Sequence, residues 1–189
     1  LAALVGAPLC KKYPNETEEI NFHAIDDMCK EISKSQIVIM PVSNSGYGIG
    51  EKDKFCDEKS PLNPISLYGK TKVEAEKVIM QRSNSVSFRL ATVFGFSYRM
   101  RTDLLVNNFV NKSVRTNKLK IFEPHFRRNF IHIRDVVAGI VYAINNFNKL
   151  KSNIYNLGLS SANISKLMLA KKIKKQIKKL QIKIIKNKK

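Results

Sequence analysis

Short runs of β-branched residues alternate along this 189-residue chain with stretches of helical periodicity. "SQIVIMPVS" (35–43) and "SVSFRLATVFG" (85–95) have the apolar composition of buried strands. Between them, Ser66 stands where a helix over 65–82 would begin, after a long polar loop at 44–64. This alternation predicts an α/β fold with a mostly parallel sheet. The other expected strands are 118–122, 129–133 and 153–158, and the other expected helices are 15–32, 103–115, 134–147 and 161–179, the last capped by Ser161.

The net charge of +19 is unevenly distributed, because residues 171–189 contain ten lysines and no acid. Such a segment can bind phosphate backbones or anionic lipids without specificity. Drift toward Lys, Ile and Asn explains the same composition, and the absence of interleaved aromatic residues favours drift. We therefore expect a Lys-rich tail over 171–189 that is aberrant or disordered, with no specific nucleic-acid partner.

Cysteine usage and hydropathy narrow the class of protein further. Cys10, Cys29 and Cys56 form no Cys-x-x-Cys pair and lack a nearby histidine cluster, so neither a disulfide framework nor a metal site is indicated. The longest apolar run, 136–144, is too short to span a bilayer. We expect a cytoplasmic protein with no membrane partner.

Three residues form a candidate catalytic set. Tyr68 and Lys72 are four residues apart on the predicted helix, so both side chains can point to one spot. An ammonium beside a phenol stabilises the phenolate and lowers the pKa of a tyrosine, which is otherwise near 10. Ser43 ends a predicted strand, where chemistry collects in parallel sheets, and its hydroxyl can hydrogen-bond a reacting oxygen. The set is typical of alcohol–ketone interconversion beside a hydride carrier.

Seven segments in order resemble the extended short-chain dehydrogenases/reductases of the NAD-dependent epimerase/dehydratase group, which act on nucleotide-activated sugars. A Tyr-x-x-x-Lys match alone is weak in a lysine-rich chain, but Ser43 stands 25 residues before Tyr68, as in the family. The matching segments are "LAALVGAP", "INFHAI", "VSNSGYG", "SPLNPISLYGKTKVEAEK", "FRLATVFG", "RRNFIHIRDVV" and "IYNLG".

The resemblance implies roles for the matched residues, with NAD or NADP as cofactor and a nucleotide-activated sugar as substrate. Tyr68 would be the general acid/base, Ser43 would orient the sugar hydroxyl, and Lys72 would bind the nicotinamide ribose. Asn21 matches a helix asparagine near the active site, and a purely structural role is an equal alternative. The backbone positions implied to line the dinucleotide are Ala2, Ala3, Leu90 and Ala91. The substrate-side residues implied are Thr92, Asp103, Asn107 and Arg128, the last an arginine for the diphosphate, with Arg127 as an alternative.

Two departures from the family pattern matter. No Gly-x-x-Gly-x-x-Gly turn occurs here to seat a pyrophosphate, so we expect the second half only of a Rossmann-like sheet, with part of a small substrate-binding lobe. We expect such a fragment alone to bind NAD(P) poorly and to turn over little. Asn44 and Ser45 stand where dehydratases of the family carry an Asp-Glu pair, which favours epimerisation or 4-keto reduction over elimination.

The resemblance also suggests a division of the chain and a partner. We expect the later half of an NAD(P)-binding domain over 1–95, mixed Rossmann and substrate-lobe segments over 96–170, and the tail over 171–189. The helices at 17–34 and 65–82 match those that pair family dimers, so a homodimer is expected. The alternative is a basic module for nucleic acid or membrane surfaces that keeps the fold without catalysis.

Overall fold

A three-stranded parallel sheet forms the centre of the first of two units, in a computed structural model that describes residues 3–50 and 55–185. The first unit comprises Leu1–Leu90 and Val137–Leu157. Its sheet has the order β1-β2-β6, and Ser43 at the end of β1 is level with Leu90 at the end of β2. The strands are β1 (Val38–Ser43), β2 (Ser85–Leu90) and β6 (Asn153–Leu157).

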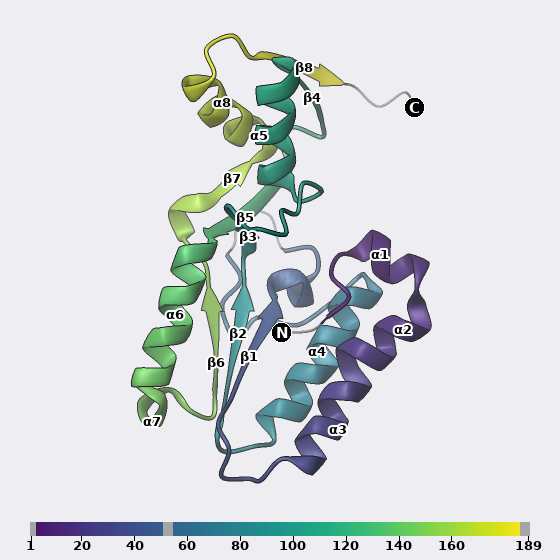
Figure 1. The fold of residues 1–189 in the computed structure, drawn as a ribbon, viewed down its shortest axis with the longest axis vertical. Coiled ribbons are helices and arrows are strands. Elements are labelled where there is room, and N and C mark those ends of the chain that lie inside the picture. The colour runs from purple at the N-terminus through teal and green to yellow at the C-terminus, as the bar shows by residue number, and fades with distance from the viewer. Residues whose placement is uncertain (1–2, 51–54, 186–189) are drawn as a thin grey trace. The chain divides into compact units, whose positions relative to one another are not determined.

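Helices cover both faces of this sheet (Figure 1), because apolar side chains of its strands point to both faces. On one face, Met40 and Val42 pack against Ala75 and Ile79 of α4. On the other face, β2 packs against α6 and α7. The helices of this unit are α1 (Ala7–Lys12), α2 (Pro14–Glu18), the π-helix η1 (Glu19–His23), α3 (Ala24–Glu31), the 3-10 helix η2 (Asn44–Tyr47), α4 (Leu67–Met80), the later part of α6 (Ile133–Asn145) and α7 (Phe147–Leu150).

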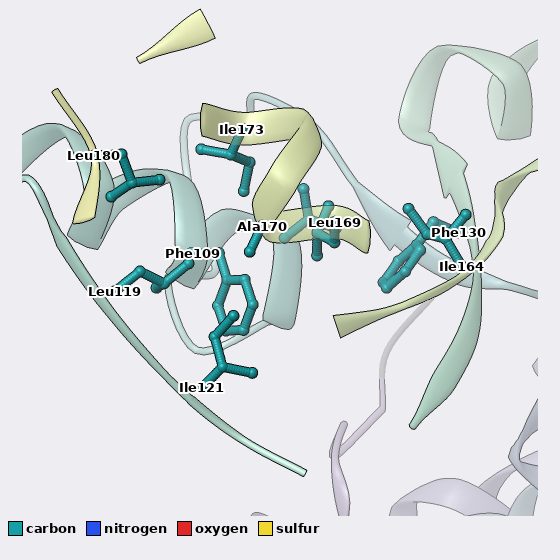
Figure 2. Close-up of a cluster of buried hydrophobic side chains, with 10 residues drawn as sticks. Phe109, Leu119, Ile121, Phe130, Ile164, Leu169, Ala170, Ile173 and Leu180 are labelled. Carbon is teal, nitrogen blue, oxygen red and sulfur yellow. The ribbon is translucent and has the colours of Figure 1, made fainter. Parts of the chain in front are cut away.

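The second unit, Ala91–Val136 and Gly158–Lys189, has an apolar core between two small sheets and two helices. Phe109 of α5 packs with Leu119 and Ile121 of β4 and with Ile173 of α8 (Figure 2). The elements are β3 (Thr92–Phe94), α5 (Leu105–Thr116), β4 (Lys118–Phe122), β5 (Arg127–His132), the 3-10 helix η3 (Ser160–Ala162), β7 (Asn163–Ser165), α8 (Lys166–Gln176) and β8 (Gln181–Ile185). Strand β5 pairs with β3 in parallel and with β7 in antiparallel, while β4 pairs with β8 in parallel.

The α/β class and the parallel sheet predicted from the sequence are confirmed, with two local differences. The expected single strand over 85–95 is two strands in different sheets, separated at Ala91. The last helix is capped by Ser165, whose Oγ accepts a hydrogen bond from the Met168 amide at 3.2 Å, and not by Ser161. Helix α8 begins later in the chain than the expected residue 161, because residues 163–165 pair with β5.

The Lys-rich segment also differs from the expected disordered tail. In the structure, residues 171–176 complete α8 and residues 181–185 form β8. The apolar residues between the lysines explain this order, since Ile173 and Leu180 are buried and Ile182 packs on the same core. The two units are each assembled from two stretches of the chain, whereas the sequence analysis divides it into three consecutive segments.

Candidate functional site

Ser43 lies at the carboxyl end of β1, where the chain turns into η2. Its Oγ accepts a hydrogen bond from the Ser45 amide at 3.1 Å and donates one to the Ser45 hydroxyl at 2.9 Å. The first bond satisfies a free amide at the start of η2, so Ser43 serves as the cap of that short helix. Ser43 is therefore partly buried and held at the edge of the sheet where β1 ends.

Tyr68 and Lys72 lie one turn apart at the start of α4. Ser66 caps this helix by accepting a hydrogen bond from the Gly69 amide at 3.1 Å. Tyr68 is partly buried, and only 6% of the Lys72 surface is exposed. Burial lowers the pKa of the Lys72 ammonium from its ordinary 10.5, and Cys10 on α1 acts weakly in the opposite direction.

Two glycines allow η2 to approach α4 closely. A Cβ added to Gly69 would lie 3.0 Å from the Ser45 carbonyl oxygen, and one added to Gly46 would lie 2.9 Å from Val73 Cγ2. Gly69 and Val73 each follow directly after a candidate catalytic residue. The turn after Ser43 is thus packed onto the part of α4 that carries Tyr68 and Lys72.

The segment before α1 is held by Asn21. This side chain is fully buried, accepts a hydrogen bond from the Leu4 amide at 2.9 Å and donates one to the Leu4 carbonyl at 2.9 Å. These two hydrogen bonds support the purely structural role for Asn21. Ala3 is partly buried beside this clamp, Ala2 lies outside the described residues, and Leu90 is partly buried at the end of β2.

The second unit contains the other predicted residues. Ala91 is buried, and Thr92 is partly buried as the first residue of β3. Asp103 accepts two hydrogen bonds of 2.7 Å from Arg101, which hold the pKa of its carboxyl below the usual value. Asn107, 7% exposed, donates to the Arg101 carbonyl at 3.1 Å. Asp103 and Asn107 thus both engage Arg101.

The side chains of two neighbouring arginines on β5 point to opposite faces of the strand. Arg127 donates a hydrogen bond from Nη2 to the Asn163 carbonyl at 2.7 Å. Arg128 is the next residue of the strand, so its side chain points to the opposite face, and it is exposed. Of the two arginines considered for a diphosphate, Arg128 is the better candidate on this geometry.

A buried ionic network next to the candidate catalytic set was not predicted from the sequence. Arg89 of β2 donates to Glu76 of α4 at 2.6 Å, and Ser87 donates to the same carboxylate at 2.7 Å. Arg89 also donates to the Tyr47 hydroxyl at 3.0 Å, and Tyr47 donates to Asn156 Oδ1 at 2.7 Å. Glu76 and Arg89 are 3% and 5% exposed, so each charge depends on the other for neutralisation.

This network adjoins the candidate catalytic set at two places. Glu76 follows Lys72 by four residues on α4, and Tyr47 is the last residue of η2. Burial raises the pKa of the Tyr47 phenol, although its hydrogen bond from Arg89 acts in the opposite direction. The available sequence signals were an arginine inside a strand of small and apolar residues and a glutamate in register with Tyr68 and Lys72.

The described residues contain neither a group of metal ligands nor a membrane-spanning helix. Within 3–50 and 55–185, no three His, Cys, Asp or Glu side chains are grouped as a metal site would need. In the same part of the chain, no helix combines the length and the apolarity needed to cross a bilayer.

Comparisons with known proteins agree with this fold. The chain is 31% identical over 157 residues to ADP-L-glycero-D-manno-heptose-6-epimerase of Brachyspira hyodysenteriae, covering 76% of this chain and 47% of that protein. It is 25% identical over 213 residues to UDP-glucuronate 4-epimerase 4 of Arabidopsis thaliana, covering 99% and 48%. The crystal structure of UDP-glucuronic acid 4-epimerase from Bacillus cereus, in complex with UDP-glucuronic acid and NAD, matches with a TM-score of 0.82 at 24% identity, covering 99% and 61%.

These matches show which family the chain belongs to and how much of its relatives' length it covers. The chain spans about half the length of such curated relatives. The model of the NAD dependent epimerase/dehydratase family matches residues 1–158, which include both β1 with its terminal Ser43 and the helix of Tyr68 and Lys72. The chain belongs to the NAD dependent epimerase/dehydratase family.

Proposed function

We propose that this chain carries the acid–base centre of an NAD(P)-dependent epimerase or 4-keto reductase that acts on a nucleotide-activated sugar. The observation that carries the proposal is the close packing of η2 on α4, which holds the end of β1 beside Tyr68 and Lys72. Relatives named as epimerases of nucleotide-linked sugars support the substrate class.

In this proposal each side chain has one task. Tyr68 takes the proton from a sugar hydroxyl as it becomes a ketone and returns it in the reverse direction. Ser43 donates a hydrogen bond to the same sugar oxygen. Lys72, buried on the same helix face, holds the nicotinamide ribose. A bound nicotinamide supplies the hydride chemistry.

The residues present fit one end of the cofactor. We assign Lys72 to the nicotinamide ribose and the backbone at Ala3 to the lining of the dinucleotide. The Asn21 clamp on the adjacent Leu4 supports the second assignment, because it holds this segment in place. The sequence contains no Gly-x-x-Gly-x-x-Gly turn for the pyrophosphate. We therefore expect weak binding of NADH by the purified chain, and a micromolar dissociation constant in a fluorescence titration would contradict that expectation.

Three further assignments remain part of the proposal. Arg128 is assigned to the nucleotide diphosphate, since its guanidinium is exposed and suits bidentate contacts. Asn44 and Ser45 carry no carboxylic acid, so we assign epimerisation or reduction and not elimination. We also propose a homodimer through α3 and α4, which mass measurement by light scattering would test.

The acid–base assignment is tested with Tyr68→Phe. With millimolar NAD and UDP-glucuronic acid or UDP-glucose, we expect epimer formation to fall by roughly 100-fold or more relative to the unsubstituted chain. Tyr142→Phe removes an exposed hydroxyl on α6 and serves as the matched control. Equal product formation by Tyr68→Phe and the control, measured by liquid chromatography, would refute the assignment.

A second readout does not depend on turnover. Lys72→Met removes the buried ammonium, and Lys70→Met removes an exposed one on the same helix. We expect Lys72→Met to weaken NADH binding further, whereas Lys70→Met leaves it unchanged. If the two variants titrate alike, Lys72 has no part in cofactor binding.

A further inference from the structure

The positive charge of this protein is concentrated in one of its two units. The second unit has 20 basic and three acidic residues, a net charge of +17, whereas the first unit has 14 basic and 12 acidic residues, a net charge of +2. Ten of the 20 basic residues of the second unit lie in 171–189. The charge excess is therefore concentrated around α8 and the residues that follow it.

Helix α8 carries a large part of this charge on its outer face. Leu169, Ala170 and Ile173 point into the apolar core of the unit (Figure 2). The remaining face exposes four lysines, namely Lys171, Lys172, Lys174 and Lys175, of which three pairs (171/174, 172/175 and 171/175) are three or four residues apart. Like charges at this spacing destabilise a helix. The free protein thus has an unfavourable charge arrangement that a bound polyanion would relieve.

The β4–β8 pair has a separate cluster of lysines on its exposed side, which faces away from α8 because Leu119 and Ile121 on its other side pack with Ile173 of that helix. Lys120 and Lys183 are direct partners in the parallel register, and both are exposed. Lys118 lies two residues before Lys120 on the same side. Like charges directly opposite each other destabilise a sheet. The ion pairs described in this unit are Arg101–Asp103 and Lys166–Glu123, so neither neutralises these lysines.

The distribution of apolar side chains indicates the kind of partner. A helix that lies in a membrane surface buries its apolar face in the lipid headgroups. The apolar face of α8 is already buried in the protein core, and Met168 is the only exposed apolar side chain among its residues. Helix α8 also has no aromatic residue for base stacking. What remains is contact with a regular array of phosphates.

We propose that the outer face of α8 binds the phosphodiester backbone of nucleic acid without reading its sequence. Each lysine–phosphate contact releases a counterion, so binding weakens steeply with salt. This surface is independent of Ser43, Tyr68 and Lys72, which lie in the first unit.

The test uses the full chain and a fluorescein-labelled 20-base-pair duplex DNA, followed by anisotropy at 50 to 200 mM NaCl. We expect a dissociation constant of about 1–100 µM at the higher salt, typical of non-specific binding. The variant K171Q/K172Q/K174Q/K175Q should weaken binding at least about tenfold and reduce the salt slope by up to about 3.6, at 0.9 per lost contact. Glutamine has nearly the helix propensity of lysine, so α8 should persist, which circular dichroism checks.

The matched control, K11Q/K34Q/K149Q/K151Q, removes the same charge from exposed positions of the first unit. It should stay within about twofold of the unsubstituted chain. Equal weakening by the two variants would show that net charge alone is responsible and would overturn the proposal. Absence of DNA binding at 50 mM NaCl would also overturn it, as would binding to phosphatidylserine vesicles without binding to DNA.

Discussion

The two units of the chain place their charged residues in opposite ways. Among the described residues, the buried ionisable side chains of Lys72, Glu76 and Arg89 all belong to the first unit. The second unit has a core of apolar side chains and keeps its much larger charge at the surface. A buried charge requires specific partners and so fixes the local structure, whereas surface charges determine which partners approach.

The largest expected effect comes from breaking the buried ion pair of the first unit. Arg89→Leu leaves the Glu76 carboxylate buried without its main partner, and we expect a loss of roughly 3–5 kcal/mol in the free energy of unfolding. Glu123→Gln removes the partly exposed pair with Lys166 in the second unit and should cost less than about 1 kcal/mol. Urea unfolding followed by circular dichroism measures both.

The double variant Glu76→Leu/Arg89→Leu sharpens the same point. Because it removes both charges together, it should recover much of the stability that Arg89→Leu loses. If Arg89→Leu costs no more than Glu123→Gln, burial does not distinguish the charges of the two units.

The next effect tests whether the Lys-rich segment belongs to the core of the second unit. Leu180 is 1% exposed and lies between α8 and β8. Leu180→Ala should therefore cost about 2–5 kcal/mol through lost burial and the cavity left behind. Lys179→Ala, at the exposed neighbouring position, should change stability by less than about 0.5 kcal/mol. Equal stabilities of the two variants would mean that residue 180 is not packed.

The smallest effect concerns the pH dependence of the first unit. Burial lowers the folded-state pKa of Lys72 below 10.5, so unfolding takes up a proton in the pH window just below 10.5. Across that window the unfolding free energy of the unsubstituted chain should rise with pH relative to Lys72→Met, by at most about 1.4 kcal/mol per pH unit. Urea unfolding at several pH values in this window measures the difference, and a difference that does not change with pH would contradict the assignment to burial.

Local pattern was sufficient to predict much of the candidate site. Tyr68 and Lys72 are one helical turn apart wherever that helix lies, and Ser43 ends a strand whose apolar composition is evident. The strand ends and helix starts follow from residues such as Ser66, which caps its helix through a local contact. Predictions of this kind depend on neighbours within a few residues in the sequence.

The features that were missed depend on contacts between distant residues. Arg89 and Glu76 are 13 residues apart, and Tyr47 and Asn156 are 109 apart, so only the folded sheet and helix show that they form one network. The strand expected over 85–95 is divided at Ala91, because its two halves find partners in different sheets. Strand β8 was not predicted because the lysines around it and Lys183 within it obscured the apolar residues that pair with β4 and pack on the core.

Periodicity and capping are local properties of the chain, so the α/β class, the family pattern and the spacing of Ser43, Tyr68 and Lys72 could be predicted before folding was considered. The packing of η2 on α4, the choice of which charges are buried and the ordered core beneath the lysines of α8 became evident only in the folded protein. Burial and pairing are properties of the surroundings of a residue, and folding brings those surroundings together from separate parts of the chain.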